Sequence, residues 1–226
     1  MWMVVRSVLM VLAVVAATVL PGVSAVNAQE DKAMLIEAVT GKDLPKIREI
    51  ISAGAELEAR DPQGRTALLL ATHANAVEIA KALIAAGADV NAKDAIKDTP
   101  FLYAGAEGRT EILEAILATA KANLKDTNRY GGTALIPASH HGHPDAVRIL
   151  LGTDIDIDHV NNLGWTALIE AVILGDGGPV YQEIVGLLVD AGARNIPDRE
   201  GVSPLDHARR NGFSELAARI EAGPRP

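Results

Sequence analysis

The chain has 226 residues, no cysteine, 21 basic and 29 acidic residues, and a formal net charge of −8 at pH 7. The lack of cysteine excludes disulfides, thiolate metal sites and a cysteine nucleophile, and an acidic chain without a long basic run is a poor candidate for nucleic-acid binding. Apolar residues make up 49% of the chain but aromatic residues only 3%, which favours closely packed helices over a β-sandwich.

The first 28 residues have the composition of a secretory signal peptide. Arg6 is the only charged residue before Glu30, and the apolar run 8–20 lies between them. This run is shorter than the roughly 20 residues of a membrane-spanning helix, so an uncleaved anchor is the less favoured alternative. A buried hydrophobic N-terminal helix is also disfavoured, because the run is apolar on all sides whereas the later helices are amphipathic. We expect cleavage after Ala28, with Ala25 as second choice, and a periplasmic or secreted protein with a net charge of −9.

The remainder of the chain repeats one phrase. Five segments carry it: DPQGRTALLLA, DAIKDTPFLYA, NRYGGTALIPA, NNLGWTALIEA and DREGVSPLDHA. Their aligned hydroxyl residues lie 33, 34, 33 and 37 positions apart: Thr66, Thr99, Thr133, Thr166 and Ser203. A second phrase, GADVNA, begins 21 residues after Thr66 at Gly87, and the same offset counted back from Gly54 reveals a degenerate first unit in which Ala33 replaces the threonine.

This pattern resembles the ankyrin repeat family, in an exported bacterial-type protein, over residues 29 to about 222. The matching residues are Asp-x-x-Gly-x-Thr-Pro/Ala-Leu at the start of each unit and Gly-Ala-Asp-Val-Asn-Ala at its end. The resemblance implies an all-α fold, an α-solenoid of about six stacked units, each with a β-turn and two antiparallel helices. The expected units 1 to 6 are residues 29–60, 61–93, 94–127, 128–160, 161–197 and 198–226.

The residue types suit these positions. The hydroxyl is placed to cap the first helix of its unit, Gly87 suits the left-handed residue that ends a second helix, and Leu150 is an expected core residue of a second helix. Three departures stand out: Lys121 where unit 3 should have glycine, Pro137 early in the first helix of unit 4, and an insertion at 175–182 between the helices of unit 5.

A histidine cluster in unit 4 is the sharpest candidate for chemistry. His140, His141 and His143 could form a metal site with Asp145 as a fourth ligand. Adjacent histidines rarely point at one ion, however, and the Gly-His pair that ends in His143 falls where ankyrin units commonly carry Gly-His in the turn between helices. A structural role is therefore favoured over a metal site.

The sequence also lacks the motifs of the common enzyme classes. It has no Gly-x-Ser-x-Gly elbow, no His-Glu-x-x-His motif and no phosphate-binding loop. Glu170 and Asp206 lie in first helices near apolar positions and are interpreted as polar contacts that stabilise the stack. We therefore expect no enzyme, no catalytic residue, no metal and no cofactor.

The resemblance implies a protein–protein interaction module that binds through its β-turn tips and the concave face of its first helices. Ten residues at these variable positions are the predicted partner-binding residues: Arg65, His73, Arg129, Tyr130, His140, His141, Leu163, Trp165, Ile173 and Leu174. We expect a protein partner of unknown identity, no nucleic acid, no stable membrane anchor after cleavage and a monomeric chain. The alternative is an accessory factor that supports a periplasmic stress-response enzyme.

Units 4 and 5 place large apolar side chains on a face that should be polar. Five of them are expected to form one exposed patch: Tyr130, Leu163, Trp165, Ile173 and Leu174. Soluble proteins seldom leave such a patch exposed without a use for it, so it is the predicted binding hot spot. In the competing interpretation, the insertion at 175–182 folds back and covers Ile173 and Leu174, which are then part of the core.

Overall fold

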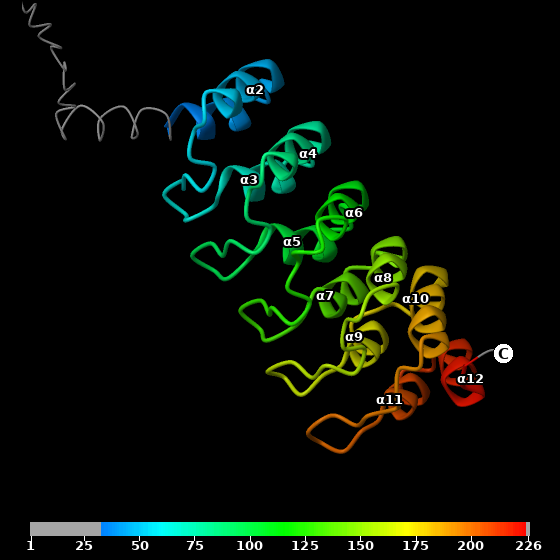
Figure 1. Cartoon of the computed structure of the whole chain (residues 1–226). Coiled ribbons are helices and arrows are strands. Elements are labelled where there is room, and N and C mark those ends of the chain that lie inside the picture. The colour runs from blue at the N-terminus through cyan, green and yellow to red at the C-terminus, as the bar shows by residue number, and fades with distance from the viewer. Residues whose placement is uncertain (1–32, 225–226) are drawn as a thin grey trace, which may run out of the picture.

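The computed structural model describes residues 33–224, which form a stack of antiparallel helix pairs with no β-strand among them (Figure 1). Residues 33–40 are helical and precede α2 (Leu44–Ser52). The following pairs are α3 (Ala67–His73) and α4 (Val77–Ala85), α5 (Pro100–Ala106) and α6 (Thr110–Leu117), α7 (Leu135–His140) and α8 (Pro144–Leu151), α9 (Ala167–Ile173) and α10 (Pro179–Asp190), and α11 (Pro204–Arg210) and α12 (Ser214–Ala222). The predicted all-α solenoid is confirmed. The predicted signal peptide lies outside the described residues and stays a prediction. The predicted unit boundaries also stay a prediction.

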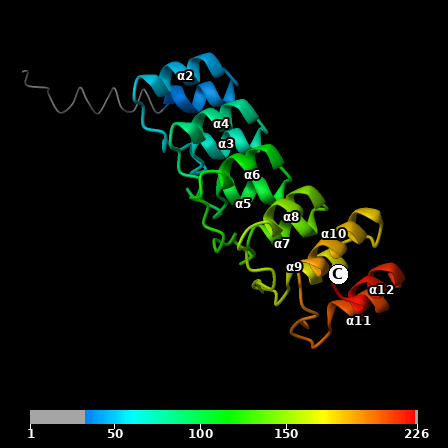
Figure 2. The same cartoon turned by 45° about the vertical axis from the view of Figure 1, so that its right-hand side comes forward.

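Successive units stack in the same orientation along one axis (Figures 1 and 2). From unit 2 onward each first helix contacts the first helix of the next unit, and each second helix contacts the next second helix. The buried apolar residues form one cluster that extends from Leu35 in unit 1 to Ala217 in unit 6. No unit therefore has a closed core of its own, as expected for a solenoid. None of the described helices is long and apolar enough to cross a membrane.

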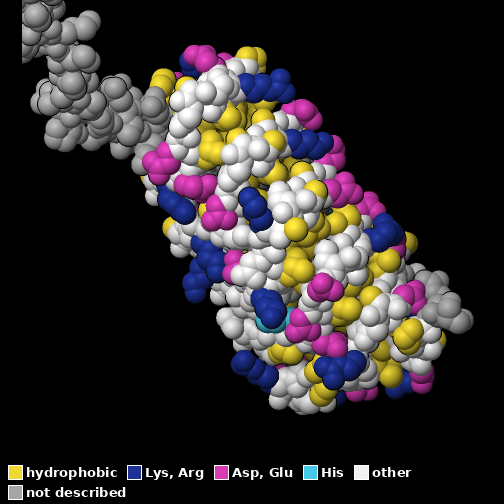
Figure 3. All heavy atoms as spheres, viewed as in Figure 1, with side chains coloured by type: hydrophobic (Ala, Val, Ile, Leu, Met, Phe, Trp, Pro, Cys, Tyr) yellow, Lys and Arg dark blue, Asp and Glu magenta, His cyan; other side chains and the backbone are white. Residues whose placement is uncertain are grey.

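The outer edge formed by the second helices carries charged side chains of both signs (Figure 3). Some of them join neighbouring units: Lys81 lies 3.3 Å from Glu111, and Arg148 lies 2.6 Å from Glu183. These pairs are exposed to solvent, so each contributes at most about 1 kcal/mol. The stack is held mainly by its apolar core.

The hydroxyl caps are present in four of the five units that have the motif. The hydroxyl oxygen accepts a hydrogen bond from the third residue of the helix at 3.0–3.3 Å in these units: Thr66, Thr99, Thr166 and Ser203. The predicted cap at Thr133 is wrong, since its buried Oγ1 has no hydrogen-bond partner among the described residues. Pro137 has no N–H for the Thr133 carbonyl, which instead accepts from Ile136 at 3.2 Å. That N–H is the one the hydroxyl would have capped.

The β-turns of units 2 to 6 share one hydrogen-bond pattern. The Oδ1 atom of the first turn residue accepts from the backbone N–H groups two and four residues later, at 2.9–3.1 Å: Asp61, Asp94, Asn128, Asn161 and Asp198. The fourth turn residue is left-handed, a glycine in every case except Lys97, whose φ is 69°. These bonds fix the direction in which the third turn residue presents its side chain.

Two departures are resolved by the structure. In unit 3 the left-handed residue after the second helix is Ala120, with φ 56°, so its predicted place at Lys121 is wrong by one residue. The insertion at 175–182 supplies the first turn of α10, a helix of 12 residues. From this turn Tyr181 donates a hydrogen bond to the His140 carbonyl at 2.8 Å. Leu174 is nevertheless 40% exposed, so the insertion extends the second helix and does not cover this residue.

Candidate protein-binding groove

A groove of about 580 Å³ follows the inner side of the stack from unit 2 to unit 5, between the turn tips and the first helices. Seven of the ten predicted partner-binding residues line it: His73, Arg129, Tyr130, His140, His141, Leu163 and Leu174. Arg65, Trp165 and Ile173 are not among its lining residues. The structure thus brings together most of the predicted set but only three of the five residues of the predicted apolar patch.

The outer wall of the groove carries a row of exposed apolar side chains. Ile96, Tyr130 and Leu163 are the third residues of three consecutive turns and are 48%, 55% and 50% exposed. At the same position Gln63 precedes and Glu200 follows them, so the apolar row is confined to units 3 to 5. Within the row, the turns of Tyr130 and Leu163 are joined by a 2.9 Å backbone hydrogen bond from Asn162 to the Tyr130 carbonyl. The apolar row is therefore presented on a fixed frame.

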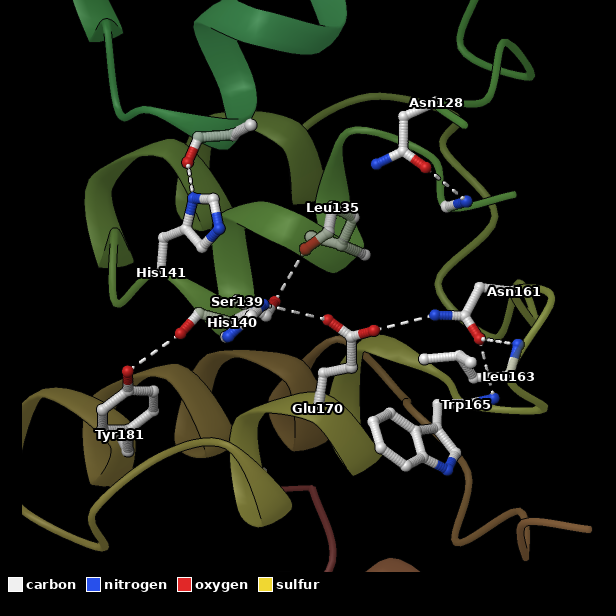
Figure 4. Close-up of polar contacts among 12 residues, drawn as sticks. Asn128, Leu135, Ser139, His140, His141, Asn161, Leu163, Trp165, Glu170 and Tyr181 are labelled. Atoms are coloured by element: carbon white, nitrogen blue, oxygen red, sulfur yellow. Dashed lines mark hydrogen bonds and ion pairs between the residues drawn. The ribbon is translucent and has the colours of Figure 1, made fainter. Parts of the chain in front are cut away.

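Glu170, in the first turn of α9, lies at the floor of the groove. The residue is 6% exposed. Its Oε1 accepts a 2.7 Å hydrogen bond from Asn161 Nδ2, and its Oε2 lies 3.6 Å from His140 Nδ1 (Figure 4). Burial raises the pKa of the Glu170 carboxyl, more strongly than the bond from Asn161 and the charge of His141 lower it. The groove floor is therefore a place where a carboxylate is poorly solvated.

The two histidines beside Glu170 have different surroundings. Burial, together with the neighbouring His141, lowers the pKa of His140, so its ring is neutral at pH 7. The His141 Nδ1 atom lies 2.8 Å from the Ala106 carbonyl oxygen, to which it donates, and 3.5 Å from Glu107 Oε1. Within residues 33–224, no three His, Cys, Asp or Glu side chains converge as metal ligands would. The cluster thus joins units 3, 4 and 5 across the groove.

A pair of stacked rings lines the unit 2 end of the groove. The His73 and Tyr103 rings are 3.7 Å apart between centroids and inclined by 10°. Burial lowers the pKa of His73 and raises that of Asp98, which also faces the charge of Asp94. His73 therefore adds no positive charge to this end of the groove at pH 7.

Three groove-lining residues are absent from the predicted binding set because that set left out one position of the first helix. The predicted residues of the first helices lie seven and eight positions after the capping hydroxyl, as His140 and His141 do. Residues three and four positions apart share one helix face, so position four also faces the groove. Tyr103, Pro137 and Glu170 occupy it. Counting back one turn from the predicted residues would have found them.

The predicted residues outside the groove have other contacts. Arg65 is held at the base of its turn by Asp61, with the NH2 and Oδ2 atoms 2.6 Å apart. Trp165 occupies the equivalent position in unit 5 and is half-buried, as is Ile173. Figure 4 shows Trp165 next to Leu163 and Glu170. Side chains at the turn base thus flank the groove without lining it in units 2 and 5.

Comparison with known proteins agrees with this architecture. Residues 14–94, 35–126 and 101–195 match the family model described as "Ankyrin repeats (3 copies)". YahD of Escherichia coli (strain K12), named as an ankyrin repeat protein, is 39% identical over 177 residues, which are 77% of this chain and 88% of YahD.

Solved structures of ankyrin repeat proteins superpose on most of the chain. A domain from Acinetobacter baumannii AYE has 51% identity and a TM-score of 0.80, and the protein EF0377 has 46% identity and a TM-score of 0.81; each match covers 83% of this chain and 96% of the other. The ankyrin repeat domain of Bcl-3, a member of the IκB protein family, has 27% identity and a TM-score of 0.76, with 85% and 86% covered. The similarity therefore extends to the groove-bearing units.

Proposed function

The chain belongs to the ankyrin repeat family, whose members generally act as protein–protein interaction modules, and on this premise we propose that the groove is its docking surface for a protein partner. The observation that carries this proposal is the apolar row of Ile96, Tyr130 and Leu163. Three large apolar side chains are about half exposed on adjacent turns, and a backbone hydrogen bond joins the turns of Tyr130 and Leu163. A contiguous exposed apolar surface beside a groove is typical of a binding site.

Tyr130 is the expected centre of the interface. Tyr130 belongs to unit 4, and the other two members of the apolar row belong to units 3 and 5. The Arg129 guanidinium lies 4.7 Å from the centroid of the Tyr130 ring. Tyrosine and arginine are over-represented among residues that dominate interface energies, because a rigid ring buries much area at a small entropic cost. A partner that covers this ring would bury apolar area from the whole row.

Affinity capture with the purified protein as bait, followed by binding measurements on the captured partner, tests this proposal. Replacing both Tyr130 and Leu163 with alanine should weaken binding by about 2 kcal/mol or more, roughly 30-fold. The matched control replaces Gln63 and Glu200, which occupy the same turn position outside the apolar row. Equal effects of the two double variants on affinity would refute the groove as the docking surface. A comparable loss in Trp165→Ala would extend the surface to the turn base of unit 5.

The place of action is a separate part of the proposal. The apolar run 8–20 and the small residues before Gln29 support export to the periplasm or cell envelope. N-terminal sequencing of protein recovered from cells tests this, and intact Met1 on soluble cytoplasmic protein would contradict it. Capture of a periplasmic stress-response enzyme would favour the narrower role of an accessory factor.

A further inference from the structure

The floor of the groove contains a buried carboxylate with one oxygen lacking a hydrogen bond. The Glu170 side chain is 8% exposed. Asn161 donates to Oε1, but Oε2 accepts no hydrogen bond from the described residues, and His140 Nδ1 lies 3.6 Å from it, beyond hydrogen-bond distance. Oε2 is not among the fully buried unpaired polar atoms of the described residues, so it faces the groove and is open to a donor there.

Unit 6 shows how the same two positions can be satisfied within the chain. There Asp198 replaces the asparagine and His207 replaces the glutamate, and His207 Nε2 lies 2.6 Å from Asp198 Oδ2. The pair in unit 6 is thus internally complete, whereas in unit 5 Glu170 retains an acceptor that lines the groove. This acceptor is available to a donor from outside the chain.

We propose that the groove recognises a basic side chain of the partner, a lysine or arginine, which donates to Glu170 Oε2 while apolar residues on either side of it contact the apolar row. This inference rests on the proposed docking function and adds the chemistry of the partner. The recognised segment is a short stretch of protein with a cation between apolar residues.

The charges around the groove favour a cation over an anion. Three carboxylates line it, those of Asp98, Glu107 and Glu170, against one guanidinium, that of Arg129. Arg129 lies at the rim over the Tyr130 ring and therefore does not occupy the floor. An acidic partner residue would have to desolvate beside a buried carboxylate, whereas a basic one gains a charge-assisted hydrogen bond.

The neighbouring histidine does not replace the missing cation. Burial and His141 lower the pKa of His140, so the ring is neutral at pH 7. The His140 Nδ1 atom lies 3.6 Å from Glu170 Oε2. Because the ring is neutral, it does not repel an ammonium or guanidinium group that binds to Glu170. Complementarity of this kind contributes to specificity and to the rate of association.

The test uses two tripeptide probes, acetyl-Leu-Arg-Leu-amide and the same peptide with neutral citrulline in place of arginine. Both are titrated into the ¹⁵N-labelled purified protein, and backbone amide shifts are followed by NMR. The arginine peptide should shift the amides of Glu170, Asn161 and the apolar row, with a dissociation constant about tenfold or more below that of the citrulline peptide. Glu170→Gln keeps the acceptor for Asn161 and should abolish this difference. Glu111→Gln, on the outer edge of the stack, should preserve it.

Each other result overturns the inference. Equal affinities of the two peptides, with shifts in the apolar row, would mean that the groove binds protein segments without selecting a basic residue, and the proposed function would stand. An arginine preference that survives in Glu170→Gln would assign the attraction to other carboxylates. If neither peptide shifts the groove, basic recognition is refuted, and the capture experiment decides separately on the docking function.

Discussion

Replacing Thr133 with valine should stabilise the protein, whereas the same replacement at Thr166 should destabilise it. The Thr166 hydroxyl caps α9 through a 3.2 Å bond from the buried Ile169 N–H, and loss of such a cap costs about 0.5–2 kcal/mol. The Thr133 hydroxyl is equally buried but has no partner among the described residues. Burial of an unpaired hydroxyl costs about 1–3 kcal/mol in proteins, so replacing it by a methyl group should recover about 1 kcal/mol.

Urea unfolding followed by the helical circular dichroism signal measures both effects, as shifts of the midpoint at constant slope. A second change tests the cause. Pro137→Ala restores an N–H for the Thr133 carbonyl, which releases the Ile136 N–H to the hydroxyl. In this background Thr133→Val should become destabilising, as at Thr166. If Thr133→Val destabilises the wild-type protein as much as Thr166→Val does, the account of the missing cap is refuted.

Three further predictions concern the core, one turn and the groove floor. Leu150→Ala should cost about 2–5 kcal/mol in urea unfolding, because Leu150 is fully buried in α8; a loss below about 0.5 kcal/mol would contradict its place in the core. Lys97→Gly should stabilise by about 0.5–1 kcal/mol, since Lys97 has φ 69°, whereas the control Lys125→Gly, at a negative φ, should destabilise. Because burial raises the folded-state pKa of Glu170 above its ordinary 4.5, the wild type loses stability as the pH rises from about 4.5 through that folded-state pKa. Glu170→Gln lacks this loss, so identical pH profiles in urea unfolding would contradict it.

The fold could be predicted because its determinants are local and repeated. The hydroxyl at each helix start and the turn residues at fixed offsets act within a single unit, and the period of about 33 residues shows that the units stack. The missing cap at Thr133 also has a local cause, because the hydroxyl and the carbonyl of Thr133 compete for the Ile136 N–H. The hydroxyl motif alone predicts that the Ile136 N–H bonds to the Thr133 hydroxyl. Because Pro137 has no N–H, the Ile136 N–H bonds to the Thr133 carbonyl instead, which the motif does not predict.

The groove was less predictable because it is formed between units. The turn tips Tyr130 and Leu163 were placed correctly, since their position follows from the register. Whether Trp165 or Ile173 reaches the groove depends on the direction of each side chain relative to the neighbouring unit, which the sequence pattern does not specify. Glu170 was recognised as a polar contact, but its unpaired Oε2 follows from a distance to His140 that only the packed stack defines.

Three local departures from the repeat pattern lie at or beside the groove, and this supports its functional role. Pro137 disrupts the start of α7, Glu170 is a buried carboxylate in α9, and Lys97 takes a left-handed conformation that glycine has in the other turns. We expect each departure to lower stability, and other units satisfy the same positions without it. Pro137 and Glu170 line the groove, and Lys97 directly follows Ile96 of the apolar row. Locally unfavourable residues are expected where function outweighs stability, so these three support the proposal that the partner docks on units 3 to 5.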